Sequence, residues 1–339
     1  MNDFPAVLRS VLRGEDLTAD TAAQAIGAIM DETLSPVRAA ALLAGLHAKG
    51  ESVEEVVGAA RAMRERSVRV SHGLPLVMDV CGTGGDGAGT INVSTCASFI
   101  VAGAGVSVAK HGNRSASSLC GSADVLEAVG VTIDRSPDDA AIRLRERGIA
   151  FLFAQRHHPA MRAVAPVRRE LGVPTIFNIL GPLTNPAGAQ RQVVGVAYPE
   201  AVELVGEALR GLGTEAAAIV HAQSGLDEIA GDAPTTVFQF DRNGTRRWTL
   251  DPARYGVSAT REQIRGGDAS VNASALVAIL RGERSPRADL IALNAALALV
   301  VAGAAEDIDD GLRLARRSVD DGAAGAKLDA LREERMEFA

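Results

Sequence analysis

The sequence predicts an α/β fold with two parts: an N-terminal helical domain and a larger α/β domain with a mainly parallel central sheet. Helix caps without any strand pattern fill residues 1 to about 70. From residue 74 onwards, apolar strand-like runs alternate with helical patterns, as in parallel βαβ units. Two such units follow each other directly, and each strand ends in a loop rich in glycine or polar residues. We therefore expect a helical domain at residues 1–72 and an α/β domain at residues 73–339.

Three helix starts are visible in the first 55 residues, and their N-caps are Thr18, Ser35 and Ser52. Pro36 follows Ser35 at the first helical position, where proline is favoured. Ser52 and Glu55 have the spacing of a capping box. Since no strand pattern interrupts these helices, we expect them to pack into one bundle.

The stretch 79–124 organises the rest of the chain. It contains, in order, the end of a strand at residues 76–80, a glycine-rich loop at 82–89, a helix from Asn92 to about residue 104, a strand at 106–109, a polar run at 110–114, a Ser-rich loop and a helix near Ser122. Open α/β sheets bind ligands in the crevice at the carboxyl ends of their strands. Glycines allow close backbone approach, and the free N–H groups of a helix start bind oxyanions. Ordinary turns would explain one such loop, but two in succession favour a phosphate site.

The glycine-rich loop also matches the dinucleotide fingerprint G-x-G-x-x-G at residues 82–87. That fingerprint requires the helix to open at its last glycine and an acidic residue about 20 positions later to bind a ribose. Here the helix begins well after Gly87, and the next strand ends in Lys110 and His111, which suit phosphate better. The pattern therefore argues against an oxidoreductase.

The rest of the chain continues the alternation of strands and helices. We expect a helix from Ser136 to Gly148, strands at 149–154, 192–197 and 216–221, and helices at 158–171, 199–212 and 289–302. Asn243 and Gly244 lie between two strand-like runs, at 236–240 and 246–250, which is a strong hairpin signal. The segment 174–186 is rich in Pro and Asn, so we expect the chain to return to the helical domain near residues 166–188.

Composition limits the class of partner and the compartment. The net charge of −7 argues against a nucleic acid or an anionic membrane as partner. No apolar run approaches about 20 residues and no charged segment precedes a shorter one, so we expect a cytoplasmic protein with no membrane association. Cys81, Cys96 and Cys120 have no paired spacing, which is typical of reduced, buried side chains rather than of disulfides or zinc ligands.

Asp227 and Glu228 are candidate metal ligands, because they follow the strand at 216–221. Hard carboxylate oxygens suit Mg²⁺, which commonly bridges a protein carboxylate and substrate phosphates. An isolated Asp-Glu pair is more often a solvated turn. This pair, however, follows the carboxyl end of a third strand, after the two that end in the ligand loops, and that position favours the metal site. The adjacent His157 and His158 have no third ligand at a suitable spacing, so a zinc site there is disfavoured.

The chain resembles the anthranilate phosphoribosyltransferase family. The motifs that carry the resemblance are GTGGD at 82–86, N-x-S-T at 92–95, KHGNR-x-x-SS-x-x-GSAD-x-LEA-x-G at 110–130, FLFA at 151–154, HPAM at 158–161, PVRREL at 166–171, TIFNILGPLTNP at 175–186 and GLDE at 225–228. They occur in order over nearly the whole chain. The resemblance implies a nucleoside phosphorylase/phosphoribosyltransferase-like fold and a homodimer formed through the helical domain.

The resemblance also implies substrates and site residues. Phosphoribosyl pyrophosphate would be bound by Gly82, Gly85, Asp86, Asn92, Thr95, Lys110 and Ser122, and anthranilate by Gly82, His111, Asn113 and Arg168. Two Mg²⁺ ions per subunit would be held, one by Ser94 and Glu228 and the other by Asp227 and Glu228. The implied reaction is displacement of pyrophosphate by the amine of anthranilate, which gives N-(5-phosphoribosyl)-anthranilate in tryptophan biosynthesis. No residue is assigned as a general acid or base.

Several of these residues also have simpler explanations. Lys110 is either a strand-end lysine or a phosphate ligand, and the glycines and hydroxyls nearby favour phosphate. His111 equally suits a turn, and Asn113 suits a left-handed turn position. Arg168 alone would more often be a solvated helix residue, although a guanidinium fork fits a planar carboxylate.

Three departures from the family pattern concern the acceptor. Gln155 stands where the family usually has Pro, Met161 stands where it often has an aromatic or small residue, and the glycine that commonly follows His221 is missing. They bear on which aromatic amine is accepted and leave the diphosphate motifs complete.

Two rival functions remain to be compared with this one. A pyrimidine nucleoside phosphorylase would share the architecture, but the KHGNR run and both acidic residues argue against it. A non-catalytic relative that binds nucleic acid would need a basic face, which this acidic chain does not predict.

Overall fold

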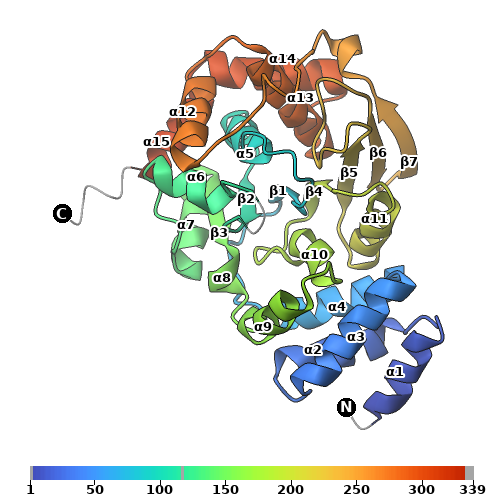
Figure 1. Cartoon of the computed structure of the whole chain (residues 1–339). Helices are drawn as coiled ribbons and strands as arrows, with labels where there is room; N and C mark the ends of the chain where they lie inside the picture. The colour runs from blue at the N-terminus through green and yellow to red at the C-terminus, as the bar shows by residue number, and fades with distance from the viewer. Residues whose placement is uncertain (1–2, 116–117, 333–339) are drawn as a thin grey trace.

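A computed structural model describes residues 3–115 and 118–332, and it confirms the predicted fold class of a helical bundle followed by a mainly parallel α/β domain. In Figure 1 the bundle forms the lower lobe of the molecule and the α/β domain the upper one. Ala116 and Ser117 of the predicted Ser-rich loop lie outside the described residues. None of the described helices is long and apolar enough to cross a membrane.

The N-terminal bundle consists of α1 (Phe4–Leu12), α2 (Ala19–Met30), α3 (Pro36–Lys49) and α4 (Val53–Glu65). The predicted starts at Thr18, Ser35 and Ser52 are confirmed as N-caps, and the capping box of Ser52 and Glu55 is present. The Glu55 side chain is buried, where it accepts hydrogen bonds from the backbone N of Ser52 and Leu17 and pairs with Lys49. This carboxylate therefore ties the start of α4 to the loop before α2.

In the part of the chain that the structure describes, seven strands form one sheet in the order β3-β2-β1-β4-β5-β6-β7. Their bounds are β1 (Met78–Gly82), β2 (Val108–Gly112), β3 (Ile149–Phe153), β4 (Arg191–Gly195), β5 (Ala216–Ala222), β6 (Thr235–Asp241) and β7 (Gly244–Leu250). Strands β1 to β5 pair in parallel, whereas β6 and β7 add an antiparallel hairpin at one edge. The hairpin predicted around Asn243 is thus confirmed.

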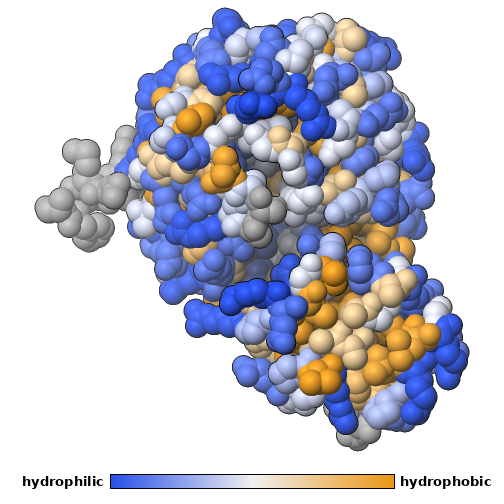
Figure 2. All heavy atoms as spheres, viewed as in Figure 1, coloured by the Kyte–Doolittle hydropathy of each residue, from blue (hydrophilic) through white to orange (hydrophobic). Residues whose placement is uncertain are grey.

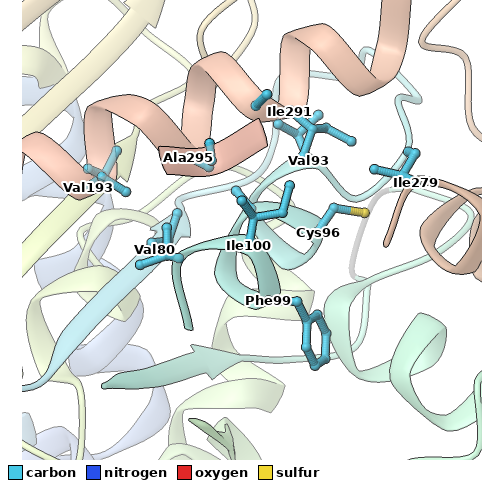
Figure 3. Close-up of a cluster of buried hydrophobic side chains, with 14 of the residues drawn as sticks. Val80, Val93, Cys96, Phe99, Ile100, Val193, Ile279, Ile291 and Ala295 are labelled. Carbon is cyan, nitrogen blue, oxygen red and sulfur yellow. The ribbon is translucent and has the colours of Figure 1, made fainter. Parts of the chain in front are cut away.

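Helices cover both faces of the sheet (Figure 1). The remaining helices are α5 (Val93–Gly103), α6 (Ser122–Ala128), α7 (Pro137–Arg147), α8 (Ala154–His157), α9 (Met161–Leu171), α10 (Phe177–Leu180), α11 (Ala201–Gly211), α12 (Ala269–Leu280), α13 (Pro286–Val301), α14 (Ile308–Asp320) and α15 (Ala323–Arg332), with 3₁₀ turns η1 (Gly181–Thr184) and η2 (Pro252–Tyr255). Helices α5 and α13 pack on one face, where Ile100 of α5 and Ala295 of α13 share a buried cluster with Val80 and Val193 of the sheet (Figure 3). Helix α5 therefore packs between β1 and α13, with its first turn beside the carboxyl ends of the strands.

Period-2 alternation places neighbouring residues of one strand in different cores on the two faces of the sheet. In β4, Val193 belongs to the core under α5 and α13, whereas Val194 belongs to the core that includes α11 and the helical bundle. Residues of α9, α10 and η1 share that second core with α2, α3 and α4; examples are Val164, Leu180 and Leu183. The chain between residues 161 and 184 therefore packs against the bundle.

Two predicted boundaries are wrong in a way that affects the site. The second strand extends to Gly112 rather than ending at residue 109, because Lys110 and His111 continue the parallel pairing with Phe151 and Leu152 of β3. The helix predicted at 158–171 begins at Met161, after the separate short helix α8. Lys110 and His111 are consequently held by the sheet and not by a loop.

Candidate functional site

The candidate site lies where the strand order reverses. Strands β1, β2 and β3 follow one another outward in one direction, and β4 and β5 continue on the other side of β1. Ligands of open α/β sheets bind in the crevice outside the carboxyl ends of the strands at such a reversal. The carboxyl ends of β1 and β4 are Gly82 and Gly195, which are direct partners in the parallel register.

The loop after β5 packs onto these two strand ends. A Cβ atom on Gly195 would lie 1.5 Å from the backbone O of Asp227, and one on Gly82 would lie 2.7 Å from Asp227 Oδ2. The missing side chains are therefore required for the loop to approach so closely. Asp227 Oδ2 also accepts a hydrogen bond of 2.8 Å from the backbone N of Gly84 in the glycine-rich loop. Three segments that are far apart in sequence thus meet at Asp227.

Glu228 connects the same loop to the start of α5. Its Oε1 accepts a hydrogen bond of 3.2 Å from the backbone N of Ser94 in the first turn of that helix. The two residues predicted to share a metal ion, Ser94 and Glu228, are therefore neighbours. The positive end of the helix dipole also favours a negative group at this position.

The acidic groups lack the positive charge needed to keep them ionised. Burial, followed by the charge of Asp86, raises the pKa of Asp227 to about 7. Burial and the charge of Asp227 raise the pKa of Glu228 well above its usual value, and Lys110 opposes this only in part. Carboxylates with raised pKa values in mutual repulsion suit a cation with more charge than one lysine provides.

The donor set fits Mg²⁺ bound together with a substrate. Carboxylate and hydroxyl oxygens of Asp227, Glu228 and Ser94 are hard ligands. Across residues 3–115 and 118–332, no group of three or more His, Cys, Asp or Glu side chains is arranged to hold a metal by itself. Such a site needs further oxygens, and Mg²⁺ typically takes them from substrate phosphates and water.

Lys110 is a buried cation between β1 and the start of α5, with 4% of its surface exposed. Its Nζ donates to the backbone O of Val80 at 2.7 Å and to Ser94 Oγ at 3.3 Å. An ammonium group has three donors, so one remains for a ligand. A buried lysine with spare hydrogen-bonding capacity beside a helix start suits a phosphate oxygen.

Hydroxyl and amide groups complete this side of the crevice. Thr95 Oγ1 is buried and has no hydrogen-bond partner among the described residues. Asn92 is the N-cap of α5, but its side chain caps no backbone N–H. Ser122 begins α6, and its Oγ donates to the backbone O of Asn113. This hydrogen bond links a residue of the predicted diphosphate site to a residue of the predicted site for the aromatic amine. Gly85 and Asp86 lie in the loop, where Asp86 Oδ1 accepts from the backbone N of Ala88.

The other side of the crevice is built around His111. Its Nδ1 lies 3.1 Å from the backbone O of Gly181, and its buried Nε2 has no partner among the described residues. The His158 ring lies 5.1 Å from the His111 ring, and both of its nitrogens are buried. Burial lowers the pKa of His111 well below its usual value, and it lowers the pKa of His158 to about 4. Both rings are therefore neutral at pH 7.

Arg168 lies on α9, half-buried, on the segment that packs against the helical bundle. Its Nη2 donates to Asn178 Oδ1 at 3.2 Å, and its guanidinium lies 5.9 Å from the Phe177 ring centroid. Burial lowers the pKa of Arg168. Within the described ranges it forms no ion pair, in contrast to most arginines on the surface of this molecule. No direct contact joins Arg168 to His111 or Asn113 in the structure.

One residue that departs from the family pattern, Gln155, contacts this side. Gln155 Nε2 lies 3.5 Å from Asn113 Oδ1, and Met161 begins α9 at the edge of the bundle core. The Gln155 side chain, which is longer and more polar than the proline usual in the family, therefore reaches Asn113 of the predicted site for the aromatic amine.

Sequence reasoning missed Asp79 and Asn185. Asp79 is fully buried; its Oδ1 accepts from the backbone N of His111, and its Oδ2 accepts from Asn185 Nδ2 at 2.8 Å. Asn185 Nδ2 also donates to the backbone O of Ala109, so it joins β2 to the segment after η1. A single charged residue in an otherwise apolar strand was the available signal for Asp79. Asn185 had none, because its role depends on tertiary contact.

Two models of the glycosyl transferase family match the chain, the helical bundle domain at residues 5–67 and the a/b domain at residues 74–325. The anthranilate phosphoribosyltransferase of Roseiflexus sp. is 51% identical over 324 residues, which cover 95% of each chain. The crystal structure of anthranilate phosphoribosyltransferase from Thermus thermophilus has a TM-score of 0.90 and 41% identity, covering 96% of this chain and 98% of that one. The enzyme of that name from Saccharomyces cerevisiae, solved in complex with phosphoribosyl pyrophosphate and Mg, has a TM-score of 0.89 and 26% identity, covering 98% of this chain and 97% of that one.

Proposed function

Because the chain belongs to the anthranilate phosphoribosyltransferase family of glycosyl transferases, we propose that the crevice between β1 and β4 is its active site and that its two sides bind the two substrates. The chain is a pentosyltransferase of tryptophan biosynthesis. It transfers the phosphoribosyl group of phosphoribosyl pyrophosphate to the amine of anthranilate and releases pyrophosphate. The convergence of three strand ends on Asp227 is the observation that carries the proposal.

The donor side binds phosphoribosyl pyrophosphate. We assign this role to the glycine-rich loop, the start of α5, the free donor of Lys110 and the start of α6; the residues are Gly82, Gly85, Asp86, Asn92, Thr95, Lys110 and Ser122. Its support is the set of unused donors: the spare proton of Lys110 and the unpartnered hydroxyl of Thr95. These groups would orient the diphosphate and exclude water from it.

The enzyme uses Mg²⁺, and we propose two ions per subunit, one held by Ser94 and Glu228 and the other by Asp227 and Glu228. When bound, the metal neutralises charge on the departing diphosphate. The contribution of the chain is to hold both carboxylates at the strand ends, where Lys110 offsets only part of their negative charge.

The acceptor side binds anthranilate. We assign His111, Asn113, Arg168 and the backbone at Gly82 to it. The neutral imidazole of His111 keeps a buried nitrogen free for a polar group of the acceptor. The amine of anthranilate is already a neutral nucleophile, so its attack on the anomeric carbon requires position rather than a strong base.

A product assay separates this reaction from its rival. With phosphoribosyl pyrophosphate and Mg²⁺, we expect pyrophosphate release that depends on anthranilate and is much slower with other aromatic amines. Ribosyl transfer from a pyrimidine nucleoside to inorganic phosphate is the reaction of a nucleoside phosphorylase. If the enzyme catalysed that phosphorolysis and released no pyrophosphate with anthranilate, the acceptor and donor assignments would both fail.

We also propose that the enzyme works as a cytoplasmic homodimer joined through the helical domain. Figure 2 shows apolar residues gathered on that domain. Leu12 of α1 is 68% exposed and Val37 of α3 is 80% exposed, and apolar patches of this kind are typical of interfaces. Cys81, Cys96 and Cys120 are buried and free, as expected in a reducing compartment.

Sedimentation velocity tests the dimer. We expect the wild-type enzyme to have twice the mass of one chain, and the variant with both Leu12→Asp and Val37→Asp to be a monomer. A monomeric wild type would contradict the proposal.

A further inference from the structure

A buried amide on α12 contacts the donor side of the crevice. Asn272 is 2% exposed, and its Nδ2 donates to Asn92 Oδ1 at 2.8 Å. The chain just before α12 also runs beside the exit of the glycine-rich loop: the backbone N of Ile91 donates to the O of Ile264, and the N of Gly266 donates to the O of Gly89. This C-terminal segment therefore braces the point where the loop becomes α5.

Hydrogen bonds fix the direction of both amides. The backbone N of Gly267, which can only donate, donates to Asn272 Oδ1 at 2.9 Å. The NH₂ of Asn272 must then face Asn92 Oδ1, and the NH₂ of Asn92 faces the backbone O of Cys120 at 3.2 Å, a group that can only accept. This relay, the row of hydrogen bonds from Gly267 through the two amides to Cys120, thus starts at a group that can only donate and ends at one that can only accept. Neither amide can therefore be turned over without breaking two hydrogen bonds.

One donor of this relay has no partner in the described ranges. The NH₂ of Asn92 has two protons, and Cys120 accepts only one of them. Because Asn92 does not cap the backbone of α5, its second N–H is left at the helix start where the diphosphate is proposed to bind.

We propose that Asn272 is a positioning residue of the donor site: it orients the Asn92 amide so that the second N–H of Asn92 donates to phosphoribosyl pyrophosphate. This inference rests on the proposed contact between Asn92 and that substrate. Without Asn272, the oxygen of Asn92 keeps only the weak thiol hydrogen bond from Cys120 Sγ at 3.7 Å, and the amide is free to turn its oxygen towards the anionic substrate.

A double-mutant cycle tests the proposal in the full-length enzyme with Mg²⁺. We expect Asn92→Ala and Asn272→Ala each to raise the KM for phosphoribosyl pyrophosphate about tenfold, because the first removes and the second misdirects the same hydrogen bond to a charged group. The KM for anthranilate should change less than about twofold, since the acceptor side is built from other segments. In the double variant the KM for phosphoribosyl pyrophosphate should be no higher than in Asn92→Ala alone.

Each outcome is decisive. If Asn272→Ala leaves the KM unchanged while Asn92→Ala raises it, or if the two effects multiply in the double variant, the positioning role is wrong. If Asn92→Ala itself leaves the KM unchanged, the contact between Asn92 and the substrate is wrong, and the positioning role fails with it.

Ser318→Ala is the matched control for lost stability. Ser318 is buried, and its Oγ donates to the backbone O of Ile100 at 2.8 Å, away from the crevice. We expect Ser318→Ala to lower Tm without changing either KM; an equal rise in the KM for phosphoribosyl pyrophosphate would show that stability alone explains Asn272→Ala. Should Asn272→Ala not fold, Asn272→Ser replaces it, because a serine is too short to reach Asn92.

Discussion

Replacing Asp227 by Asn together with Glu228 by Gln is expected to lower turnover in saturating Mg²⁺ at least about 1,000-fold. Amides are poor Mg²⁺ ligands, and a metal on a leaving diphosphate contributes several kcal/mol, at about 1.4 kcal/mol per decade of rate. The binding of phosphoribosyl pyrophosphate, followed by calorimetry at several Mg²⁺ concentrations, should lose most of its dependence on the metal. That measurement tests the metal assignment without relying on turnover.

The fold of this variant should remain intact. The raised pKa of Asp227 means that its ionised form is disfavoured by the substrate-free fold. This cost grows as pH rises from the ordinary value of 3.8, where the unfolded carboxyl ionises, and is fully present above about pH 7, where the buried carboxyl also loses its proton. A neutral amide removes the cost, so we expect Tm at pH 8 to be unchanged or higher. The matched control is Asp320→Asn with Asp321→Asn, an adjacent acidic pair at the end of α14 and away from the crevice. Normal activity at limiting Mg²⁺ in the Asp227 and Glu228 variant would refute the assignment.

The elements of the donor side were predictable because they depend on local pattern. A strand, glycines and a helix start are consecutive in the sequence, and a parallel sheet places successive strand ends at one edge. The topology then brings Asp227 to Gly82 and Glu228 to Ser94, although about 140 residues separate each pair.

What could not be predicted depends on tertiary contact. Lys110 and His111 looked like loop residues because polar side chains usually end a strand, yet pairing with β3 keeps them in the sheet. Lys110 is tolerated there because the carbonyl of Val80 accepts a hydrogen bond from its ammonium group. The amides of Asn185 and Asn272 act only through partners that are distant in the sequence, so no local pattern identifies them.

Arg168→Ala is expected to raise the KM for anthranilate about 10- to 100-fold. A carboxylate that enters a water-poor site needs a counter-charge, and a guanidinium fork meets both of its oxygens. A charge-assisted hydrogen bond contributes roughly 1.5–3 kcal/mol, at about 1.4 kcal/mol per decade of affinity. The structure supports this role because Arg168 is half-buried, its pKa is lowered by burial, and its one described side-chain acceptor is the neutral Asn178.

The neighbouring arginine provides the control. Arg169 lies on the same helix but is exposed, so Arg169→Ala removes an equal charge without removing a half-buried guanidinium, and we expect either KM to change less than about twofold. The KM for phosphoribosyl pyrophosphate should also move little in Arg168→Ala, because that substrate is proposed to bind across the glycine-rich loop and Lys110. If Arg168→Ala weakened both substrates equally, or neither, Arg168 would not be the carboxylate anchor. A rise confined to anthranilate, and absent with an amine that lacks the carboxylate, would instead show that Arg168 recognises that group.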